Sequence, residues 1–491
     1  MRLTELARGH EIIPPSVESV EADPEITGLS ENSRAITPGM LFVAVRGTSD
    51  DGHRYVADAL ARGAAAVVVE RPEAPLPVPT VRVPSSRNAL AELAARHFGH
   101  PARELAIIGF TGTFGKTSTS AILRELLAAG GAKPGVLGSL GARFGDFHDP
   151  GHGLTTPAPV ELQRALRGLR DAGADTVIME VTSHALRLGR VAGLRFSGGL
   201  LAAIMPGEHT DFHRSYEDYI DAKRLFLDYV SEEATLAYDA DNRASRLLAG
   251  EARVASTAGF SLHGRAVELP LKNVALDGRG AHFSVHGRRL RSPLLGRGHL
   301  KNVALALAYA TAAGVPLETS RTVLQRLRPL PRRMEQYSVD GRLVLDDTAG
   351  HPESLQATFD VAAMLVRAPD MAASRTCVVY AIRGSRGTDI NQRNARALAD
   401  LASEHGVSTL IVTASADIAG PHDRATPEEI EATRAAFQAK GQKIRWCDGL
   451  AAAARAALEE TRAGDLIVLV GAQGMNDGRR LLSSAGTSPR T

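Results

Sequence analysis

The chain has 491 residues, of which 44% are hydrophobic and 23% are charged, and its formal net charge at pH 7 is +2. That length predicts two to four domains, and no apolar run reaches the roughly 18 residues that a membrane span needs. Charges of both signs are spread along the chain, so we expect neither nucleic acid nor membrane as a partner. Only two cysteines, Cys377 and Cys447, and a start without a secretory pattern favour the cytoplasm over a disulfide framework or a cysteine-based zinc site.

The first two zones of the chain differ in the pattern of their apolar and polar stretches. Residues 1–100 end with a proline-studded segment and a helical pattern at 89–98, and are expected to form a small mixed domain. In residues 101–328 apolar runs alternate with amphipathic stretches, with helices expected at 160–172 and 216–230 and a strand at 176–181. That alternation predicts a parallel sheet covered by helices.

In the third zone, residues 329–491, apolar runs again alternate with amphipathic stretches after the break at Pro329-Leu-Pro331. Expected strands are 343–345, 377–381, 410–413 and 466–470, and expected helices are 354–366, 427–440 and 449–462. A second open, Rossmann-like α/β domain follows from this pattern. The small, polar residues 483–491 are expected to be disordered. The fold class is therefore α/β, with three domains.

The run from Gly109 to Ser118, Gly-Phe-Thr-Gly-Thr-Phe-Gly-Lys-Thr-Ser, lies between an apolar stretch and a helix-forming one. It is typical of a phosphate-binding loop, because glycines let backbone N–H groups turn toward phosphate and the following helix start adds positive potential. Lys116 supplies a charge, and the Thr117 hydroxyl can ligate Mg²⁺. The common pattern G-x-x-x-x-G-K-[ST] expects glycine at Phe110, and the alternative is a glycine-rich turn without a ligand.

Glu180 ends the apolar run that begins at Thr176. Open parallel sheets bind ligands at the carboxyl ends of their strands, so we expect Glu180 to be a magnesium ligand. The alternative is an ordinary solvated charge in a loop.

Several further motifs occur in the order seen in the Mur ligases, which the chain resembles over essentially its whole length. They are Asn32-Ser-Arg34, Thr155-Thr-Pro157, Met179-Glu-Val-Thr-Ser-His-Ala-Leu186, His209-Thr-Asp-Phe-His213, Tyr219-Ile-Asp-Ala-Lys223 and Arg333-Met-Glu335. The phosphate-loop variant of that family, Thr-Gly-Thr-x-Gly-Lys-Thr, also explains Phe110. Within the family, the resemblance is strongest to the branch that adds the third residue to UDP-N-acetylmuramoyl-L-alanyl-D-glutamate during peptidoglycan precursor synthesis.

The resemblance implies an ATP- and Mg²⁺-dependent ligase that activates a carboxylate as an acyl phosphate and joins it to an amino acid. It implies a UDP-substrate domain (1–100), a central ATP-binding domain (101–328) and a C-terminal ligase domain (329–491), in a monomer or weak homo-oligomer. The metal set is Thr117, Glu180, His209 and Lys223, with Lys223 carbamylated by CO₂, and the catalytic set is Lys116, Lys223, Glu180 and His209. The nucleotide set is Gly112, Thr113, Gly115, Lys116, Thr117, Ser118, Asn302, Arg333 and Asp347. The substrate set is Ser33, Thr155, Thr156, Thr182, Arg190 and Arg386.

The chain departs from that family at positions that select the incoming amine. Ser415-Ala-Asp-Ile418 replaces the Asp-Asn-Pro-Arg motif of the diaminopimelate-adding enzymes, and Ala472-Gln-Gly-Met-Asn476 replaces Gly-Lys-Gly-His-Glu. Without the arginine fork and the carboxylate, diaminopimelate is disfavoured. Two alternatives stay open: a divergent paralogue that joins another carboxylate and amine, and a nucleotide-binding pseudo-ligase.

Overall fold

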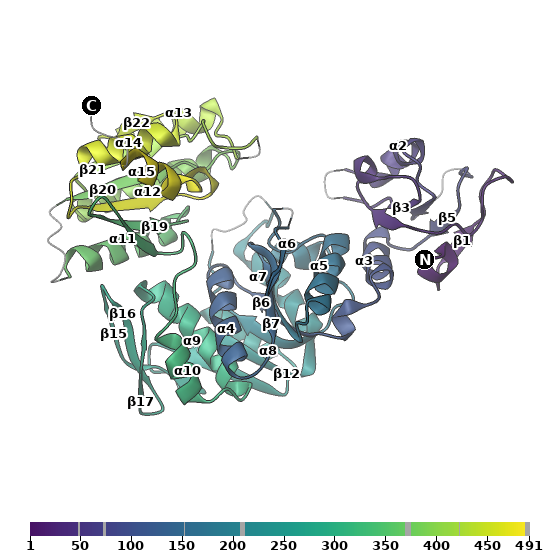
Figure 1. Cartoon of the computed structure of the whole chain (residues 1–491), viewed down its shortest axis with the longest axis horizontal. Helices are drawn as coiled ribbons and strands as arrows, with labels where there is room; N and C mark the ends of the chain where they lie inside the picture. The colour runs from purple at the N-terminus through teal and green to yellow at the C-terminus, as the bar shows by residue number, and fades with distance from the viewer. Residues whose placement is uncertain are drawn as a thin grey trace. The chain divides into compact units, whose positions relative to one another are not determined.

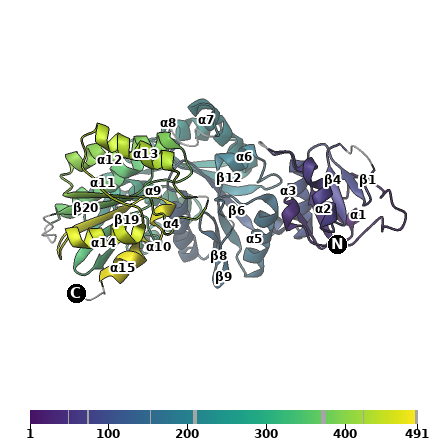
Figure 2. The ribbon, with the colours of Figure 1, turned by 90° about the horizontal axis from the view of Figure 1, so that it is seen from above.

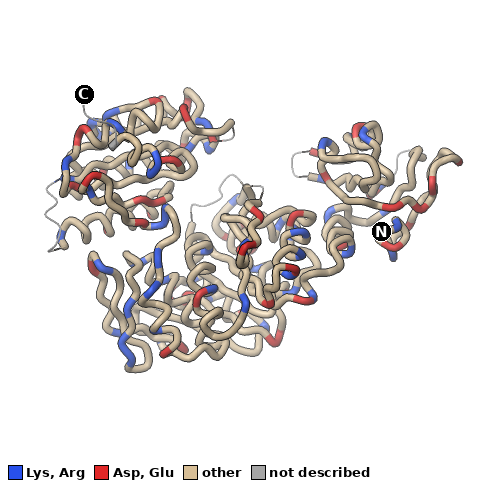
Figure 3. The backbone as a smooth tube through the Cα atoms, in the orientation of Figure 1, with Lys and Arg blue, Asp and Glu red and all other residues tan. Residues whose placement is uncertain are grey.

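The computed structural model describes residues 1–47, 50–71, 75–151, 153–206, 212–368, 375–421 and 423–486. The chain divides into two compact units, Met1–Pro270 with Ala304–Ser320 and Leu271–Val303 with Arg321–Thr491. This division leaves the domain boundaries at residues 100 and 328 as predictions. Within the described ranges, no helix is long and apolar enough to cross a membrane. Figure 3 shows acidic and basic residues interspersed along the backbone, with no long run of one sign.

The N-terminal region forms a small mixed sheet, as its sequence predicts. In the order of the sheet its strands are β1 (Glu11–Ile13), β5 (Thr80–Arg82), β4 (Ala66–Val69), β3 (Met40–Val43) and β2 (Gly28–Ser30). All neighbours pair in parallel except β1 with β5. The helices are α1 (Leu3–Leu6), α2 (Val56–Ala61) and α3 (Ser86–His97). Apolar side chains of α1 and α3 share one core cluster, whereas Ala59 of α2 belongs to another.

A nine-stranded sheet forms the centre of the first unit. Its order is β14 (Leu269–Pro270), β13 (Ser256–Ser261), β12 (Val230–Asp239), β11 (Phe196–Leu201), β6 (Ala106–Thr111), β10 (Thr176–Glu180), β7 (Pro134–Gly138), β8 (Gly141–Phe144) and β9 (Phe147–Asp149). The pairing is parallel from β14 to β7, and β8 and β9 add an antiparallel edge. The predicted parallel sheet is confirmed.

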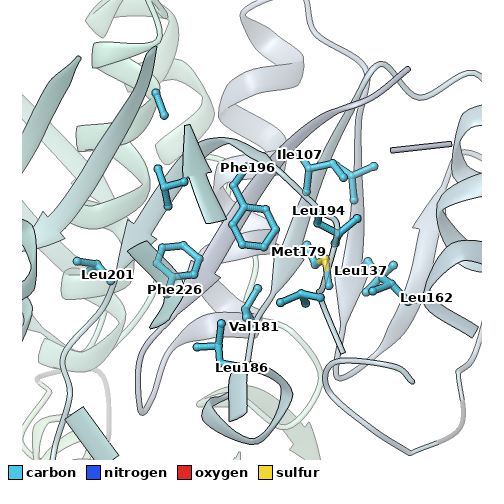
Figure 4. Packing of buried hydrophobic residues seen from close by; sticks show 14 of the residues in the cluster. Ile107, Leu137, Leu162, Met179, Val181, Leu186, Leu194, Phe196, Leu201 and Phe226 are labelled. Carbon is cyan, nitrogen blue, oxygen red and sulfur yellow. The ribbon is translucent and has the colours of Figure 1, made fainter. Parts of the chain in front are cut away.

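Helices cover both faces of this sheet. They are α4 (Lys116–Ala129), α5 (Pro159–Asp171), α6 (Ser183–Arg187), α7 (Tyr216–Arg224) and α8 (Arg243–Glu251), with a 3₁₀ helix at Leu225–Tyr229. Figure 1 shows α4 and α5 on opposite sides of β6 and β7, and Figure 2 shows them on opposite sides of β6. The core beneath α5 includes Leu162, Met179, Phe196 and Phe226 (Figure 4). Gly109 of β6 lies against the two phenyl rings, where a Cβ atom would be 2.7 Å from ring carbons, so only glycine allows this packing.

A three-stranded antiparallel sheet was not anticipated from the sequence. It consists of β15 (Lys272–Asp277), β16 (Gly280–Val285) and β17 (Arg288–Ser292), and is followed by α9 (Gly296–Ala312) and α10 (Leu317–Leu324). Its strands alternate exposed and buried residues, but several arginines and histidines on the exposed face obscure an apolar pattern.

The second unit contains the predicted C-terminal α/β sheet. Its order is β18 (Glu335–Val339), β19 (Arg342–Asp347), β23 (Leu466–Val470), β20 (Thr376–Ala381), β21 (Thr409–Thr413) and β22 (Arg445–Cys447). All pairs are parallel except β18 with β19. The helices are α11 (Pro352–Val366), α12 (Thr388–Glu404), α13 (Pro427–Ala439), α14 (Leu450–Glu460) and α15 (Gly478–Gly486).

The two faces of this sheet have separate cores. Side chains of α11, α12 and α13 pack with one set of strand residues, and those of α14 and α15 pack with the alternate set. The expected disorder of residues 483–491 is wrong for its first part, because α15 extends to Gly486 and buries Leu482 on the sheet. Residues 487–491 lie outside the described part of the chain.

Candidate active site

The predicted phosphate loop connects β6 to α4 through residues 112–115. Gly112 has φ 153° and Gly115 has φ 83°, and a Cβ atom on Gly112 would lie 2.6 Å from Cβ of Ala202. Both positions therefore require glycine. Phe110 is fully buried inside β6 and does not belong to the turn, which explains why a phenyl group is accepted where the common pattern has glycine.

Lys116 is the first residue of α4, and its side chain bends back over the loop. The Lys116 Nζ donates hydrogen bonds to the carbonyl oxygens of Gly112 (2.9 Å) and Thr113 (3.1 Å). The Thr113 hydroxyl lies 3.1 Å from the Tyr219 hydroxyl and accepts a hydrogen bond from the Met205 N–H at 2.9 Å. These contacts hold an ammonium group and a helix N-terminus at one place, which is the arrangement that binds phosphate. Ser118, the last predicted nucleotide residue of the loop, is buried in the first turn of α4.

Glu180 ends β10, next to the phosphate loop. Its carboxylate accepts hydrogen bonds from the Thr117 hydroxyl (3.2 Å), the Ser139 N–H (3.2 Å) and the Ser139 hydroxyl (3.3 Å). The side chain is almost completely buried. Burial raises the pKa of Glu180, while the nearby Lys116 ammonium and these hydrogen bonds lower it. Gly138 leaves room for the carboxylate, because a Cβ atom there would lie 2.1 Å from Glu180 Oε1. The reading of Glu180 as a solvated loop charge is therefore wrong.

The donor set around Glu180 suits a hard divalent cation. The Glu180 carboxylate and the hydroxyl groups of Thr117 and Ser139 are oxygen ligands, which Mg²⁺ prefers. Among the described residues, no three His, Cys, Asp or Glu side chains gather in a way that could hold a metal. A cation here would accordingly depend on hydroxyl, water and substrate oxygens as well as one carboxylate. Ser139 comes directly after β7, and Glu180 is the last residue of β10, so the same strand-end reasoning could have found Ser139 in the sequence.

Lys223 lies beneath the phosphate loop. Its side chain comes from α7, is 1% exposed, and donates to the Thr111 hydroxyl (3.0 Å) and the Gly112 carbonyl (3.1 Å). The Nζ atom is 5.2 Å from the centre of the Tyr219 ring. Lys223 is thus part of the site and not a surface charge.

His209 lies outside the described residues, so its predicted role as a metal ligand stays a prediction. His213, from the same motif, is buried near the start of α7. Its Nε2 is 2.9 Å from the Ser183 hydroxyl, and its Nδ1 is 3.5 Å from an Asp218 carboxylate oxygen. Burial lowers the pKa of His213 although Asp218 raises it. This second histidine was missed by sequence reasoning.

Four of the predicted substrate residues form one network at the same sheet edge. The Thr156 hydroxyl donates to the Glu180 carbonyl (3.0 Å) and accepts from the Thr182 N–H (3.0 Å), and Arg190 donates to the Thr156 carbonyl at 3.1 Å. The Thr155 hydroxyl lies 2.9 Å from that of Ser139. Ser33 is not part of this network: it is buried in the N-terminal region, where its hydroxyl pairs with Asp58.

The remaining predicted residues lie in the second unit. Asp347, at the end of β19, accepts hydrogen bonds from the Met334 N–H (3.2 Å) and the Thr358 hydroxyl (2.8 Å), and burial raises its pKa. Arg333 donates to the Thr348 hydroxyl. Asn302 is on α9, three residues after the buried His299, whose pKa is lowered by burial and raised by Asp347.

Arg386 lies in the loop between β20 and α12 of the same sheet. Its backbone N–H donates to the buried Glu429 carboxylate at 2.8 Å, and its guanidinium is 3.5 Å from Asp423. A phosphate loop with a buried lysine and a buried carboxylate, as in the first unit, is typical of enzymes that bind a nucleotide and transfer its phosphoryl group.

Comparison with known proteins identifies the family. Three family models match the chain: "Mur ligase family, catalytic domain" at residues 25–98, "Mur ligase middle domain" at 110–310 and "Mur ligase, glutamate ligase domain" at 332–473. A UDP-N-acetylmuramoyl-L-alanyl-D-glutamate–2,6-diaminopimelate ligase of Chlorobaculum tepidum is 33% identical, covering 91% of this chain and 87% of its own. A UDP-N-acetylmuramyl-tripeptide synthetase of Roseiflexus sp. is also 33% identical, with coverage of 94% and 93%.

Solved structures agree in fold. A UDP-N-acetylmuramoyl-L-alanyl-D-glutamate–2,6-diaminopimelate ligase aligns with a TM-score of 0.63 at 21% identity, covering 94% of this chain and 96% of its own. A MurF ligase of Thermotoga maritima in complex with ADP aligns with a TM-score of 0.62 at 20% identity, covering 93% and 97%. The chain belongs to the Mur ligase family, and it is an ATP-dependent ligase that forms C–N bonds.

Proposed function

We propose that this ligase joins a carboxylate of UDP-N-acetylmuramoyl-L-alanyl-D-glutamate to the amine of an amino acid, and so adds the third residue of a peptidoglycan precursor. The observation that carries this proposal is the cluster of Lys116, Thr117 and Glu180 at one sheet edge. A relative named for that substrate and a relative named as a UDP-N-acetylmuramyl-tripeptide synthetase are each 33% identical to the chain over more than 90% of its length.

Residues of this chain stabilise the charge that develops in the reaction and orient the substrate, and the reaction has two steps. In the first, a carboxylate oxygen of the substrate attacks the γ-phosphorus of ATP and ADP leaves; the Lys116 ammonium and the N-terminal amides of α4 stabilise the charge on the transferred group. In the second, the amine nitrogen attacks the acyl carbon, phosphate leaves and the nitrogen loses a proton. Thr156, Thr182 and Arg190 orient the first substrate through the network around Glu180.

For the metal, we propose Thr117 and Glu180 as direct ligands, with His209 and Lys223 at a second position. Mg²⁺ bound there would neutralise charge on the phosphates during transfer. Lys223 fits the proposal of carbamylation by CO₂ because its Nζ lies at the base of the phosphate loop, where a carboxylate-like group would face cations.

A phosphate-release assay tests the proposal. Purified protein is incubated with ATP, Mg²⁺, UDP-N-acetylmuramoyl-L-alanyl-D-glutamate and single amino acids. We expect release of phosphate with one or a few amino acids, in equal amount with a new UDP-linked tripeptide detected by mass spectrometry. Silence with every amino acid would contradict the proposed substrates. If calorimetry then also detected no ATP binding, a ligase for other substrates would be excluded as well.

A further inference from the structure

Arg332 has a backbone conformation that is rare for its residue type. Its φ is 56°, in the left-handed region where a Cβ atom is disfavoured, and Met334 has φ 51°. Arg333, one of the proposed nucleotide residues, lies between them. Two such residues in a segment of three persist only if surrounding contacts determine the conformation.

The Arg332 guanidinium provides those contacts. It is 10% exposed and forms an ion pair with the buried Asp346 at 3.1 Å. Its other hydrogen bonds all reach backbone or side-chain oxygens at the ends of two neighbouring strands, β19 and β23. These oxygens belong to Asp347 (backbone, 3.5 Å), Gly471 (backbone), Ala472 (backbone, 2.9 Å) and Asn476 (side chain, 2.7 Å). One arginine thus connects the segment that carries Arg333 to the loop at residues 471–476.

That loop lies at the carboxyl edge of the six-stranded sheet. It follows β23, the strand between β19 and β20. Gly474 packs against Ser415, with a Cβ position 3.3 Å from the Ser415 hydroxyl. The Ser415 side chain is fully buried, and its hydroxyl has no hydrogen-bond partner among the described residues. Ligands of open α/β sheets bind at this edge.

The chemistry of the edge excludes one class of amine. Asn476 is exposed, and one lone pair of its Oδ1 accepts a hydrogen bond from Arg332, so two N–H donors and a single lone pair of this amide face a ligand. The two carboxylates at the end of β19 are also engaged: Asp346 by Arg332 and Tyr337, and Asp347 by Thr358 and the Met334 N–H. Such an amide favours a carbonyl, hydroxyl or carboxylate group of the ligand, and it offers an ammonium group no carboxylate partner.

We propose that Arg332 is a positioning residue for amine selection: it fixes the 471–476 loop through Asn476 and restricts the second substrate to amino acids without a distal cationic group. This inference rests on the proposed function, since it assumes that an amino acid is the second substrate. It goes beyond that function because it names the class of side chain and a residue that controls it.

The test compares kcat/KM for phosphate release across two sets of amino acids. One set is neutral or acidic (alanine, serine, glutamate), and the other carries a distal ammonium group (ornithine, lysine, diaminopimelate). For the unaltered protein we expect the best member of the first set to exceed the best of the second by at least about tenfold. Arg332→Gly keeps the left-handed backbone and removes the guanidinium, and should reduce that ratio about tenfold, mainly through KM of the amine.

Arg342 offers a matched control at the opposite end of β19. Its guanidinium is also buried and donates to the Thr461 hydroxyl (2.9 Å), the Thr461 carbonyl (2.8 Å) and the Leu458 carbonyl (3.1 Å). Arg332→Lys and Arg342→Lys lose similar numbers of hydrogen bonds, so both should lower the melting temperature. Only Arg332→Lys should change the ratio between the two sets of amines.

A surface variant covers the case in which the arginine variants do not fold. Asn476→Asp changes an exposed side chain, keeps a partner for Arg332, and should raise kcat/KM for lysine or ornithine at least severalfold. Three results would each overturn the inference and leave the proposed function intact. They are similar kcat/KM values for the two sets of amino acids in the unaltered protein, the same change of that ratio in Arg332→Lys and Arg342→Lys, or an unchanged ratio in Asn476→Asp. Silence of the unaltered protein with every amine would instead remove the proposed function, and this inference with it.

Discussion

The two sheets present different chemistry at their carboxyl edges. In the nine-stranded sheet, Glu180 is surrounded by the hydroxyl groups of Thr117 and Ser139, and lysines approach from α4 and α7. In the six-stranded sheet, Asp346 is neutralised by the guanidinium of Arg332. At the first edge, hydroxyl and carboxylate oxygens that now bond to each other could bind a cation instead. At the second edge, the carboxylates bond to protein groups and fix the neighbouring loops. Under our proposals, the first edge carries the chemistry of the ligase and the second edge selects its amine.

Glu429 extends the same contrast. Its buried carboxylate accepts hydrogen bonds from the backbone N–H groups of Ser385, Arg386 and Gly387, at 3.0, 2.8 and 2.7 Å. A carboxylate of the protein thereby occupies backbone donors ahead of α12 that elsewhere bind anions. The second edge is consequently preorganised by an internal ion pair and charge-assisted hydrogen bonds.

The largest effect is expected at the first edge, from Lys116→Ala. Removing the ammonium group from the phosphate loop should lower the rate of phosphate release about 10³-fold, because charge on the transferred group loses its nearest stabilising cation. Lys133→Ala, which changes an exposed lysine of the same unit, should leave the rate unchanged. Steady-state phosphate release measures both. A Lys116→Ala enzyme with a nearly normal rate would break the contrast, since the first edge would then not carry the chemistry.

Lys223→Ala tests the second lysine of that edge. We expect a loss of about 10²–10³-fold in phosphate release, with partial rescue by added acetate, because a small carboxylate can replace a carbamate at the base of the loop. Carbon-13 NMR of the unaltered protein supplied with labelled bicarbonate should show a carbamate signal that the variant lacks. Retained activity of the variant without acetate would show that the Lys223 side chain is dispensable. A missing carbamate signal at saturating bicarbonate would show that Lys223 acts only as an ammonium group.

The sequence anticipated the first edge far better than the second. The phosphate loop and Glu180 follow from local rules, because a glycine turn between strand and helix and an acid at a strand end each have a defined place in a parallel sheet. Arg332 could not be found this way: its partners are 14 to 144 residues distant in the chain, and its left-handed backbone has no signature in a non-glycine residue. The antiparallel strands at 272–292 were missed for a related reason, since their pairing depends on tertiary packing and not on an apolar pattern.

Glu180→Gln tests the pH dependence of stability at the first edge. Burial raises the pKa of Glu180 above its ordinary value of 4.5, so the native state keeps this proton to higher pH than the unfolded chain. The contribution of the neutral carboxyl to stability is complete below pH 4.5 and is lost as pH rises through the raised pKa. Glutamine stays neutral, so without Mg²⁺ the variant should be more stable than the unaltered protein at pH 7, by about 1.4 kcal/mol per unit of pKa shift.

Urea unfolding without Mg²⁺ at several pH values from 4.5 to 8 measures this gap, which should widen as pH rises. The same variant should release phosphate about 10²-fold more slowly, because an amide oxygen is a poorer magnesium ligand than a carboxylate. Thr117 and Ser139 can keep their hydrogen bonds to either side chain, so packing is preserved. If the difference in unfolding free energy between the variant and the unaltered protein did not change with pH, burial would not oppose ionisation of Glu180.

The smallest effect is expected at the second edge, from Ser415→Ala. This change removes a buried hydroxyl that makes no hydrogen bond among the described residues, so the free energy of unfolding should rise by roughly 0.5–1 kcal/mol. Ser320→Ala is the matched control, because Ser320 is equally buried and lacks a partner in the same part of the chain that the structure describes, but lies on α10. Both variants should be stabilised in urea. Only Ser415→Ala should raise KM for the amine, by about three- to tenfold at unchanged kcat, because only Ser415 packs against the loop at residues 471–476, through Gly474. If the two serine variants behave alike, the carboxyl edge of the six-stranded sheet does not contact the amine, and selection must be sought elsewhere.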